Sequence, residues 1–497
     1  MDAIRDHVLH SRAGRLGANG VSSREDVKRI LAKAAQSPEL GLVLHFHGGL
    51  VNAAGGKEIA TRLAPIYFAA GTYPVFFVWE SGLIETLKNN LSDIKDDSVF
   101  RELVKKAAEW ALKQLGSGAV TKSAGGAAVN KDQLRDDFDK WFDGVAAEPP
   151  LSDDPGTGAP AQKTKAVVPD EDDLAGNIEA EFDNDERFQE VMAGLYVASK
   201  RGTQATTKGG SPPAADVKVL VSDEALKELF PGTSANSTKG LLAWIKIAKF
   251  VAKVVIAVVK RHIKDRDHGT YTTIVEEVLR AAYLDKVGEV AWRSMKNDTS
   301  DAFGDDPQSV GKAVLDELTA LAAQGKTFKR IVLVGHSTGA IYINHWIEHA
   351  AKALPGTPFE IVLLAPANRF EGFEQVLVNH AASIKNFRMF AMTDENESND
   401  ELVPIIYPRS LLYFVSGVLE GEADVPIMGM QRFYKFDGND FPSVGRVRAW
   451  LEEGAGRRVW SIDETVNGLG SKSLKHGDFD NDEVTVASIG FILKNGF

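Results

Sequence analysis

The chain has 497 residues, of which 44% are hydrophobic, and it carries a formal net charge of -12. A chain this acidic is not drawn as a whole to nucleic acid or to anionic membranes, and nucleic acid is not expected as a partner. The absence of cysteine excludes disulfides, thiolate metal sites and a cysteine nucleophile.

The N-terminal segment "MDAIRDHVLHSRAGRLGANG" has charges throughout and lacks an apolar stretch, so no signal peptide is predicted. No uninterrupted apolar run is long enough for a transmembrane segment. Because the absence of cysteine also fits a reducing compartment, we expect a cytoplasmic protein.

Residues 1–81 predict the first part of an α/β core. Ser22 to Glu25 has the form of a capping box ahead of a short helix. Two runs rich in β-forming residues follow, Leu40–His47 and Tyr73–Ser81, with a helical segment over residues 57–71 between them. Strand, helix and strand joined by short links indicate a parallel sheet.

Residues 82–327 interrupt this pattern with several blocks of helical periodicity, and only "DVKVLVS" (216–222) resembles a strand. The tracts 116–130 and 146–173 are rich in small, polar, proline or acidic residues, and we expect them to be poorly ordered. The sequence therefore predicts a large helical insertion that forms a cap or lid.

The sheet pattern returns in residues 328–497, where helical segments separate four further apolar runs. These predicted strands are Phe328–Gly335, Phe359–Ala367, Asn386–Asp394 and Arg457–Asp463. The fold class is therefore α/β, with a mostly parallel sheet built from both ends of the chain and flanked by helices.

Ser337 lies in "RIVLVGHSTGA", where an apolar strand runs into the pattern G-x-S-x-G and a helical segment follows. Such a serine occupies a sharp strand-to-helix turn, and small neighbours are needed because strand and helix pass close together. The backbone N–H of Thr338 then lies at the helix start, where it can donate to a developing oxyanion. Ser337 is the candidate nucleophile.

With this motif, residues 40–81 and 328–497 resemble the α/β-hydrolase superfamily in its lipase- and esterase-like branch. Stretches such as "HGGLV", "FFVWESGL", "YPRSLLYFVSGVLE" and "HGDFDND" are similar to those of an uncharacterised bacterial group of predicted hydrolases. The resemblance covers about half of the chain, excludes the insertion, and implies the chain order serine, acid, histidine for a catalytic triad.

The resemblance implies His476 as the general base, because it follows the last predicted strand in the polar loop "SKSLKHGDFDNDE". His345 and His349 lie on the helix after Ser337 and are expected to face away from the cleft. His380 precedes a strand and would lie at the wrong end of the sheet.

The acid that orients the histidine should follow a strand between Ser337 and His476. Asp394 comes first after such a strand, in "FRMFAMTDENESNDE", and is the preferred candidate. Glu397 and Asp400 remain alternatives in the same acidic loop.

The second oxyanion donor is expected in "HFHGGL", the loop after the first strand of the core. The resemblance to the His-Gly-x form of this loop implies that Gly49 donates its N–H, with Leu50 as the alternative. Catalytic roles are thus expected for Ser337, His476 and Asp394, with Gly49 and Thr338 forming the oxyanion hole.

Two patterns were weighed as metal sites and rejected. His45 and His47 share one face of a strand, but such a pair is more often packed or hydrogen-bonded than metal-bound. The segment 478–482 alternates acids as a calcium loop does, yet lacks the glycine and glutamate at later positions of that loop. No metal and no cofactor is expected.

Residues 241–264 form an expected helix whose lysines all fall on one narrow stripe opposite a broad apolar face. The cost of placing several lysines in hydrocarbon argues against a membrane span. A buried cap helix is the first interpretation, and an interfacial lid with peripheral lipid contact is the second.

The sequence thus predicts a serine hydrolase that cleaves carboxylic esters, either small molecules or lipid-like, through an acyl-enzyme intermediate. An amidase, thioesterase or acyltransferase with the same machinery is an alternative, and so is a non-catalytic scaffold. The sequence does not indicate an oligomeric state.

Overall fold

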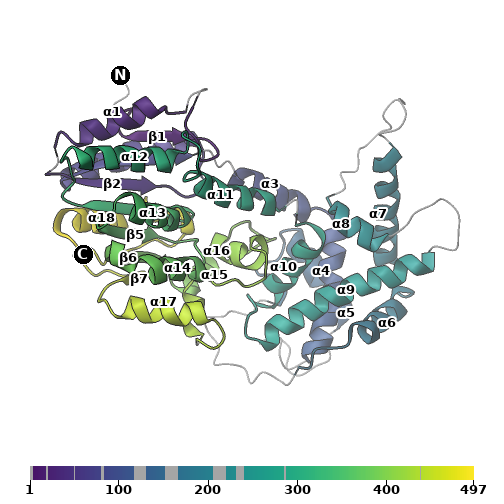
Figure 1. Cartoon of the computed structure of the whole chain (residues 1–497). Coiled ribbons are helices and arrows are strands. Elements are labelled where there is room, and N and C mark those ends of the chain that lie inside the picture. Colours follow the sequence, from purple (N-terminus) through teal and green to yellow (C-terminus); the bar gives the residue numbers. More distant parts are fainter. Residues whose placement is uncertain are drawn as a thin grey trace.

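The computed structural model describes residues 4–17, 21–37, 39–49, 51–79, 83–116, 130–151, 166–204, 220–230, 240–284, 287–436 and 438–497. Within these ranges the chain forms a seven-stranded sheet in the order β1-β3-β2-β4-β5-β6-β7 (Figure 1). Every pairing between neighbouring strands is parallel. The strands are β1 Val8–Ser11, β2 Gly41–Phe46, β3 Thr72–Trp79, β4 Ile331–His336, β5 Phe359–Leu364, β6 Ile384–Met392 and β7 Arg458–Ser461. The α/β class is confirmed.

The sheet is assembled from both ends of the chain, because β2 pairs with β3 on one side and with β4 on the other. In this register Leu44 lies opposite Leu333, although 289 positions separate the two residues in the sequence. The six predicted strands are all present, with ends that differ by a few residues. The sequence missed β1, a four-residue edge strand that contains a histidine and a serine and therefore lacks an apolar run.

Helices cover both faces of the sheet. One face carries α1 Arg24–Ala34, α12 Val310–Ala323, α13 Gly339–Ala353, α14 Phe370–His380 and α17 Pro442–Glu452. The other face carries α2 Ala53–Ala69 and α18 Glu483–Asn495. Each layer buries its apolar side chains against the strands, which is the usual arrangement for a parallel sheet.

The cap of α1 is one residue further along the chain than the sequence predicted. Ser23, rather than Ser22, is the N-cap, and its side chain accepts from the N–H of Asp26. The Asp26 carboxylate accepts in return from the Ser23 N–H at 2.9 Å. An aspartate therefore completes the capping box in place of Glu25, because its shorter side chain also reaches the N-cap amide.

Helices from α3 to α10 form a helical lobe beside the sheet, with α3 and α11 close to the junction (Figure 1). These helices are α3 Leu83–Lys95, α4 Ser98–Leu115, α5 Lys131–Phe142, α6 Glu171–Phe182, α7 Glu186–Gln204, α8 Asp223–Leu229, α9 Gly240–Ile263, α10 Thr270–Ala282 and α11 Glu289–Asp301. Although α12 falls within the expected insertion 82–327, it packs against α1 and α13 on the sheet.

Much of the two tracts expected to be poorly ordered lies outside the described residues. Described parts remain at their edges, and α6 begins within the second tract, at Glu171. Most of "DVKVLVS" also lies outside, and its described end, residues 220–222, is not a strand.

The long helix α9 packs its apolar face inside the helical lobe. Val251, Val255 and Val258 are buried where α9 meets α4, α6 and α10. Lys249 and Lys253, on the charged stripe, form ion pairs with Asp172 and Glu228. Most described apolar side chains of α9 are thus covered by protein, and Ile263 at its end is exposed. No helix in the described ranges is long and apolar enough to cross a membrane.

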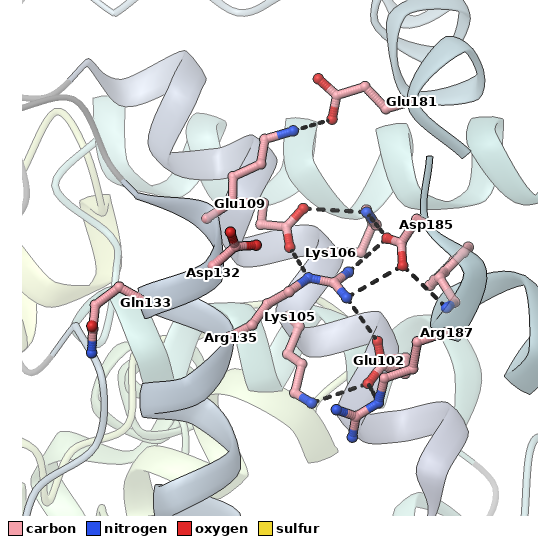
Figure 2. Close-up of polar contacts among 12 residues, drawn as sticks. Glu102, Lys105, Lys106, Glu109, Asp132, Gln133, Arg135, Glu181, Asp185 and Arg187 are labelled. Atoms are coloured by element: carbon pink, nitrogen blue, oxygen red, sulfur yellow. Dashed lines mark hydrogen bonds and ion pairs between the residues drawn. The ribbon is translucent and has the colours of Figure 1, made fainter. Parts of the chain in front are cut away.

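A network of charged side chains lies between α4, α5 and α7 (Figure 2). Lys106 on α4 bonds Glu109 at 3.2 Å and also bonds Asp185. Arg135 on α5 approaches Asp185 at 2.6 Å. Lys106 has 3% of its side chain exposed, so these charges are compensated by one another rather than by water.

Short segments complete the carboxyl-terminal half of the chain. They are η1 Ala381–Ser383, α15 Asp394–Asn399, α16 Leu411–Phe414, η2 Val415–Leu419, η3 Gln431–Lys435 and η4 His476–Asp478. Helix α16 continues directly as the π-helical turn η2.

Candidate functional site

Ser337 lies between the end of β4 and the start of α13, with a backbone φ of 54°. A positive φ is strained for serine, and neighbouring backbone holds the residue in place. Its N–H donates to the carbonyl of Leu364 at 2.9 Å, and its own carbonyl accepts from the N–H of Ala367 at 3.1 Å. These two bonds tie the turn to the end of β5, so the strained conformation is supported from outside the turn.

The two glycines of the motif are required by close packing rather than by unusual φ angles. A Cβ on Gly339 would lie 2.2 Å from the carbonyl oxygen of Phe46 on β2. A Cβ on Gly335 would lie 2.8 Å from the backbone of Gly339. The expected close passage of strand and helix is therefore present on both sides of Ser337.

His476, in η4 after β7, contacts the hydroxyl of Ser337. Its Nε2 lies 2.9 Å from Ser337 Oγ, and 139 positions separate the residues in the sequence. Burial, together with the neighbouring His336, lowers the pKa of His476 to about 3. The ring is therefore neutral near pH 7, and its Nε2 can accept the hydroxyl proton.

The neutral tautomer that accepts at Nε2 carries its proton on Nδ1. That Nδ1 is buried and has no hydrogen-bond partner among the described residues. The acidic loop nevertheless reaches the same histidine, because Asp400 Oδ2 accepts from the backbone N–H of His476 at 2.8 Å. Burial raises the pKa of Asp400, and the hydrogen bond from His476 opposes that shift.

The structure does not bring Asp394, the preferred acid, to the imidazole. Its Oδ1 accepts from the hydroxyl of Tyr413 at 2.7 Å, and its N–H donates to Gln431. Glu397 is buried and accepts from the hydroxyl of Ser410. Burial raises the pKa of Glu397 well above its usual range. Of the three acids considered, Asp400 alone contacts His476 within the described residues.

The expected oxyanion loop lies against the serine. A Cβ on Gly48 would lie 3.2 Å from Ser337 Cβ, and one on Gly49 would lie 2.6 Å from Thr338 Oγ1. Gly49 and Thr338 are therefore neighbours, and in the described part of the chain neither backbone N–H has a backbone acceptor. The alternative donor, Leu50, lies outside the described residues.

The loop is shaped by His47, which connects the ends of β2 and β3. Its Nδ1–H donates to the carbonyl of Gly48 at 2.7 Å, and its Nε2 accepts from the N–H of Trp79 at 3.1 Å. Burial lowers the pKa of His47 to about 4, so the ring stays neutral while serving both bonds. Both ring nitrogens of His47 are thus hydrogen-bonded to backbone groups.

A second histidine–aspartate pair lies beside the site and was missed by the sequence analysis. His336 Nε2–H donates to the carbonyl of His476 at 2.9 Å, and its Nδ1 lies 3.5 Å from Asp480 Oδ2. Burial opposes the charged ring, but Asp480 outweighs it and raises the pKa of His336. The signal in the sequence was the histidine inside the G-x-S-x-G motif itself.

The patterns weighed as metal sites have other roles. His45 contacts the hydroxyl of Tyr67 at 3.0 Å. Asp482 caps α18 by accepting from the N–H of Thr485. Asp480 pairs with His336. No cluster of metal-ligating side chains is found in the part of the chain that the structure describes.

The remaining histidines after Ser337 lie elsewhere. His345 faces Glu348 at 3.6 Å, His349 stacks on Phe303, and His380 ends α14.

The candidate site is closed in this structure. Ser337 is 2% exposed and His476 is 4% exposed. Met295 of α11 covers the oxyanion loop, because a Cβ on Gly49 would lie 2.5 Å from its Sδ. Neither of the two described cavities is lined by Ser337 or His476.

Comparisons of the chain with family models, curated proteins and solved structures gave no match.

Proposed function

We propose that the protein is a serine hydrolase that acts on carboxylic esters. The observation that carries the proposal is the 2.9 Å contact between Ser337 Oγ and the buried, neutral imidazole of His476. A serine hydroxyl becomes an effective nucleophile only when a positioned base accepts its proton. The positive φ of Ser337 adds support, since strained backbone concentrates at functional positions.

In this mechanism Ser337 Oγ attacks the ester carbonyl while its proton moves to His476 Nε2. The N–H groups of Thr338 and Gly49 stabilise the negative charge on the carbonyl oxygen, a contribution of about 3–4 kcal/mol per donor in comparable sites. His476 then protonates the leaving alcohol, and an acyl group remains on Ser337. Water, deprotonated by His476, attacks the acyl-enzyme and releases the acid.

We propose Asp400, in place of Asp394, as the acid that orients His476. Asp400 is already bonded to the backbone N–H of this residue, and the buried Nδ1 of the same residue lacks a partner among the described residues. Contact between the second carboxylate oxygen and Nδ1–H would fix the tautomer and stabilise the imidazolium. Asp394 is committed to Tyr413.

The experiment is labelling of the full chain with a fluorophosphonate probe, which reacts with activated serines. We expect the wild type to be labelled, and Ser337→Ala and His476→Ala to lose the label. Ser416→Ala is the matched control, since Ser416 is also fully buried and donates only to the carbonyl of Val425. An unlabelled wild type would support a scaffold without turnover, and labelling of Ser337→Ala would place the nucleophile elsewhere.

The bond that is cleaved is tested separately with matched substrates. A panel of p-nitrophenyl esters, thioesters and anilides of the same acyl group separates ester hydrolysis from thioesterase and amidase activity. Turnover stimulated by an added alcohol or amine would indicate acyl transfer. We expect the esters to be turned over faster than the anilides, because p-nitrophenoxide leaves with little proton donation from His476, whereas the anilide nitrogen has to be protonated. Faster turnover of the thioesters than of the esters would indicate a thioesterase.

A further inference from the structure

A cavity of about 610 Å³ lies beside β7, the edge strand of the sheet. We call it the cationic cavity. Its lining comes from the start of α15, from η3, from α17 and from β7. The lining residues are Asp394, Gln431, Arg432, Tyr434, Lys435, Arg448, Glu452, Arg458 and Trp460.

The charge of this lining is opposite to that of the chain. It contains four cationic and two acidic side chains, in a protein whose formal net charge is -12. The other described cavity, about 280 Å³, has two glutamates and one arginine. A concave surface with excess positive charge concentrates anions, so the cationic cavity differs from its surroundings in the ligand that it attracts.

Arg432 provides a second, independent observation. This residue is 5% exposed, and its Nη2 donates to the carbonyl of Asp267 at 3.0 Å. Its Nε–H is buried without a hydrogen-bond partner among the described residues. The same guanidinium lies 3.7 Å from the buried Asp424, so Arg432 adds partly compensated positive charge to the lining.

Part of this positive charge is compensated, because Arg432 lies 3.7 Å from Asp424 and Lys435 lies 3.8 Å from Asp265. Arg448 has no ion pair among the described residues. Asp394 accepts from the hydroxyl of Tyr413 at 2.7 Å, and Glu452 lies 3.9 Å from Arg458. Arg448 directs Nη1 to two backbone carbonyls. A guanidinium fork can bind a phosphate or carboxylate through two parallel hydrogen bonds.

The cavity also offers an aromatic surface. Trp460 and Tyr434 meet edge to face with ring centroids 5.1 Å apart, and the Arg458 guanidinium lies 4.9 Å from the Tyr434 ring centre. Trp460 is partly exposed. Flat, conjugated groups stack on such rings, and the neighbouring cation strengthens the contact.

We propose that the cationic cavity binds a small organic anion in which a phosphate or carboxylate is attached to a flat aromatic group. The acidic group meets the arginines and lysine, and the flat group rests on Trp460. This inference does not depend on the proposed hydrolase activity, because it concerns binding at a place that neither Ser337 nor His476 lines.

The test is isothermal titration of the full chain with phenyl phosphate, benzoate and the neutral analogue benzyl alcohol. We expect saturable binding of one or both anions, weaker binding at high salt, and no binding of benzyl alcohol. Binding of phenyl phosphate alone or of benzoate alone supports the site and identifies its acidic group.

The site is located by substitution. The double variant Lys435→Gln/Arg458→Gln should weaken anion binding by about tenfold or more, since each charge-assisted hydrogen bond contributes about 1.5–3 kcal/mol. Arg446→Gln is the matched control, because Arg446 shares α17 with Arg448 but pairs with Glu374. Circular dichroism confirms folding of each variant.

Two outcomes overturn the proposal. One is the absence of saturable binding of either anion to the wild type. The other is equal weakening in the double variant and in Arg446→Gln, which would show a general charge effect. Ser337→Ala is expected to bind as the wild type does, so loss of hydrolase activity and loss of anion binding are measured apart.

Discussion

At the scale of single residues, His476 combines features that a general base requires. Its Nε2 faces Ser337, its carbonyl is held by His336, and its N–H is held by Asp400. The backbone of the histidine is thus fixed from two sides, and only ring rotation remains free. Such restraint keeps the reacting atoms within hydrogen-bond distance, which is the largest part of what a positioned base supplies.

Asp400→Asn is expected to lower kcat for p-nitrophenyl esters by about 10²- to 10⁴-fold with little change in KM, because the amide cannot stabilise the imidazolium. Steady-state kinetics across pH checks this. Glu395→Gln, in the exposed part of the same acidic segment, is the control and should keep the wild-type rate. A large loss in Asp394→Asn together with an active Asp400→Asn would contradict our assignment of the acid.

Sequence order alone could single out Ser337 and His476, which the structure brings into contact, but not the acid that contacts His476. Ser337 is marked by a motif with steric requirements, and His476 by its position after the last strand. Asp394 and Asp400 both follow the end of β6 within a few residues, so their positions in the sequence do not separate them. Side-chain direction separates them, because α15 turns Asp394 toward Tyr413 and ends at Asn399, just before Asp400.

At the scale of elements, the sequence indicated the strands of the sheet more clearly than it indicated how the charged helices pack. β2 to β5 are buried at every residue, so each was visible as a run of mostly hydrophobic letters. β6 and β7 also contain partly exposed positions. The charges of α4 in contrast occur at spacings of three and four, the pattern of an exposed helix face. Only the packing of α5 and α7 against that face makes it a buried network (Figure 2).

Lys106→Met on α4 is expected to lower the free energy of unfolding by about 3–5 kcal/mol, because the acids Glu109 and Asp185 then share a single cation, Arg135. Lys113→Met on the same helix is the matched control. Lys113 has 35% of its side chain exposed and pairs with Glu181, so its loss should cost about 1 kcal/mol or less. Urea unfolding followed by circular dichroism measures both, and equal costs would contradict mutual compensation within the network.

The helix α11 is expected to control access to Ser337, because its Met295 lies over Gly49. Met295→Ala removes most of that cover, and we expect fluorophosphonate labelling to become severalfold faster. Met192→Ala, at a buried methionine of α7, is the control for general loosening of the fold. Unchanged labelling in Met295→Ala, or equal acceleration in both variants, would show that substrates enter by another route.

At the scale of the whole molecule, burial of neutral histidines couples stability to pH. Burial lowers the pKa of His45 and of His476 to about 3 and that of His47 to about 4, from 6.5. Below about pH 6.5 the unfolded chain binds protons at these rings while the folded chain does not, so the free energy of unfolding falls with pH. His336 opposes this trend, because its pKa is raised by Asp480 despite burial.

The variant His45→Gln isolates one of these rings. At about pH 5.5 a single histidine that stays neutral in the folded chain lowers the free energy of unfolding by about 1.4 kcal/mol relative to neutral pH, because only the unfolded chain binds the proton. Between about pH 7.5 and 5.5 the wild type should therefore lose about 1.4 kcal/mol more stability than the variant, whatever their difference at neutral pH. Urea unfolding at the two pH values measures this. Parallel losses in the two proteins would mean that His45 takes up its proton inside the fold, which would contradict a desolvated ring between β2 and α2.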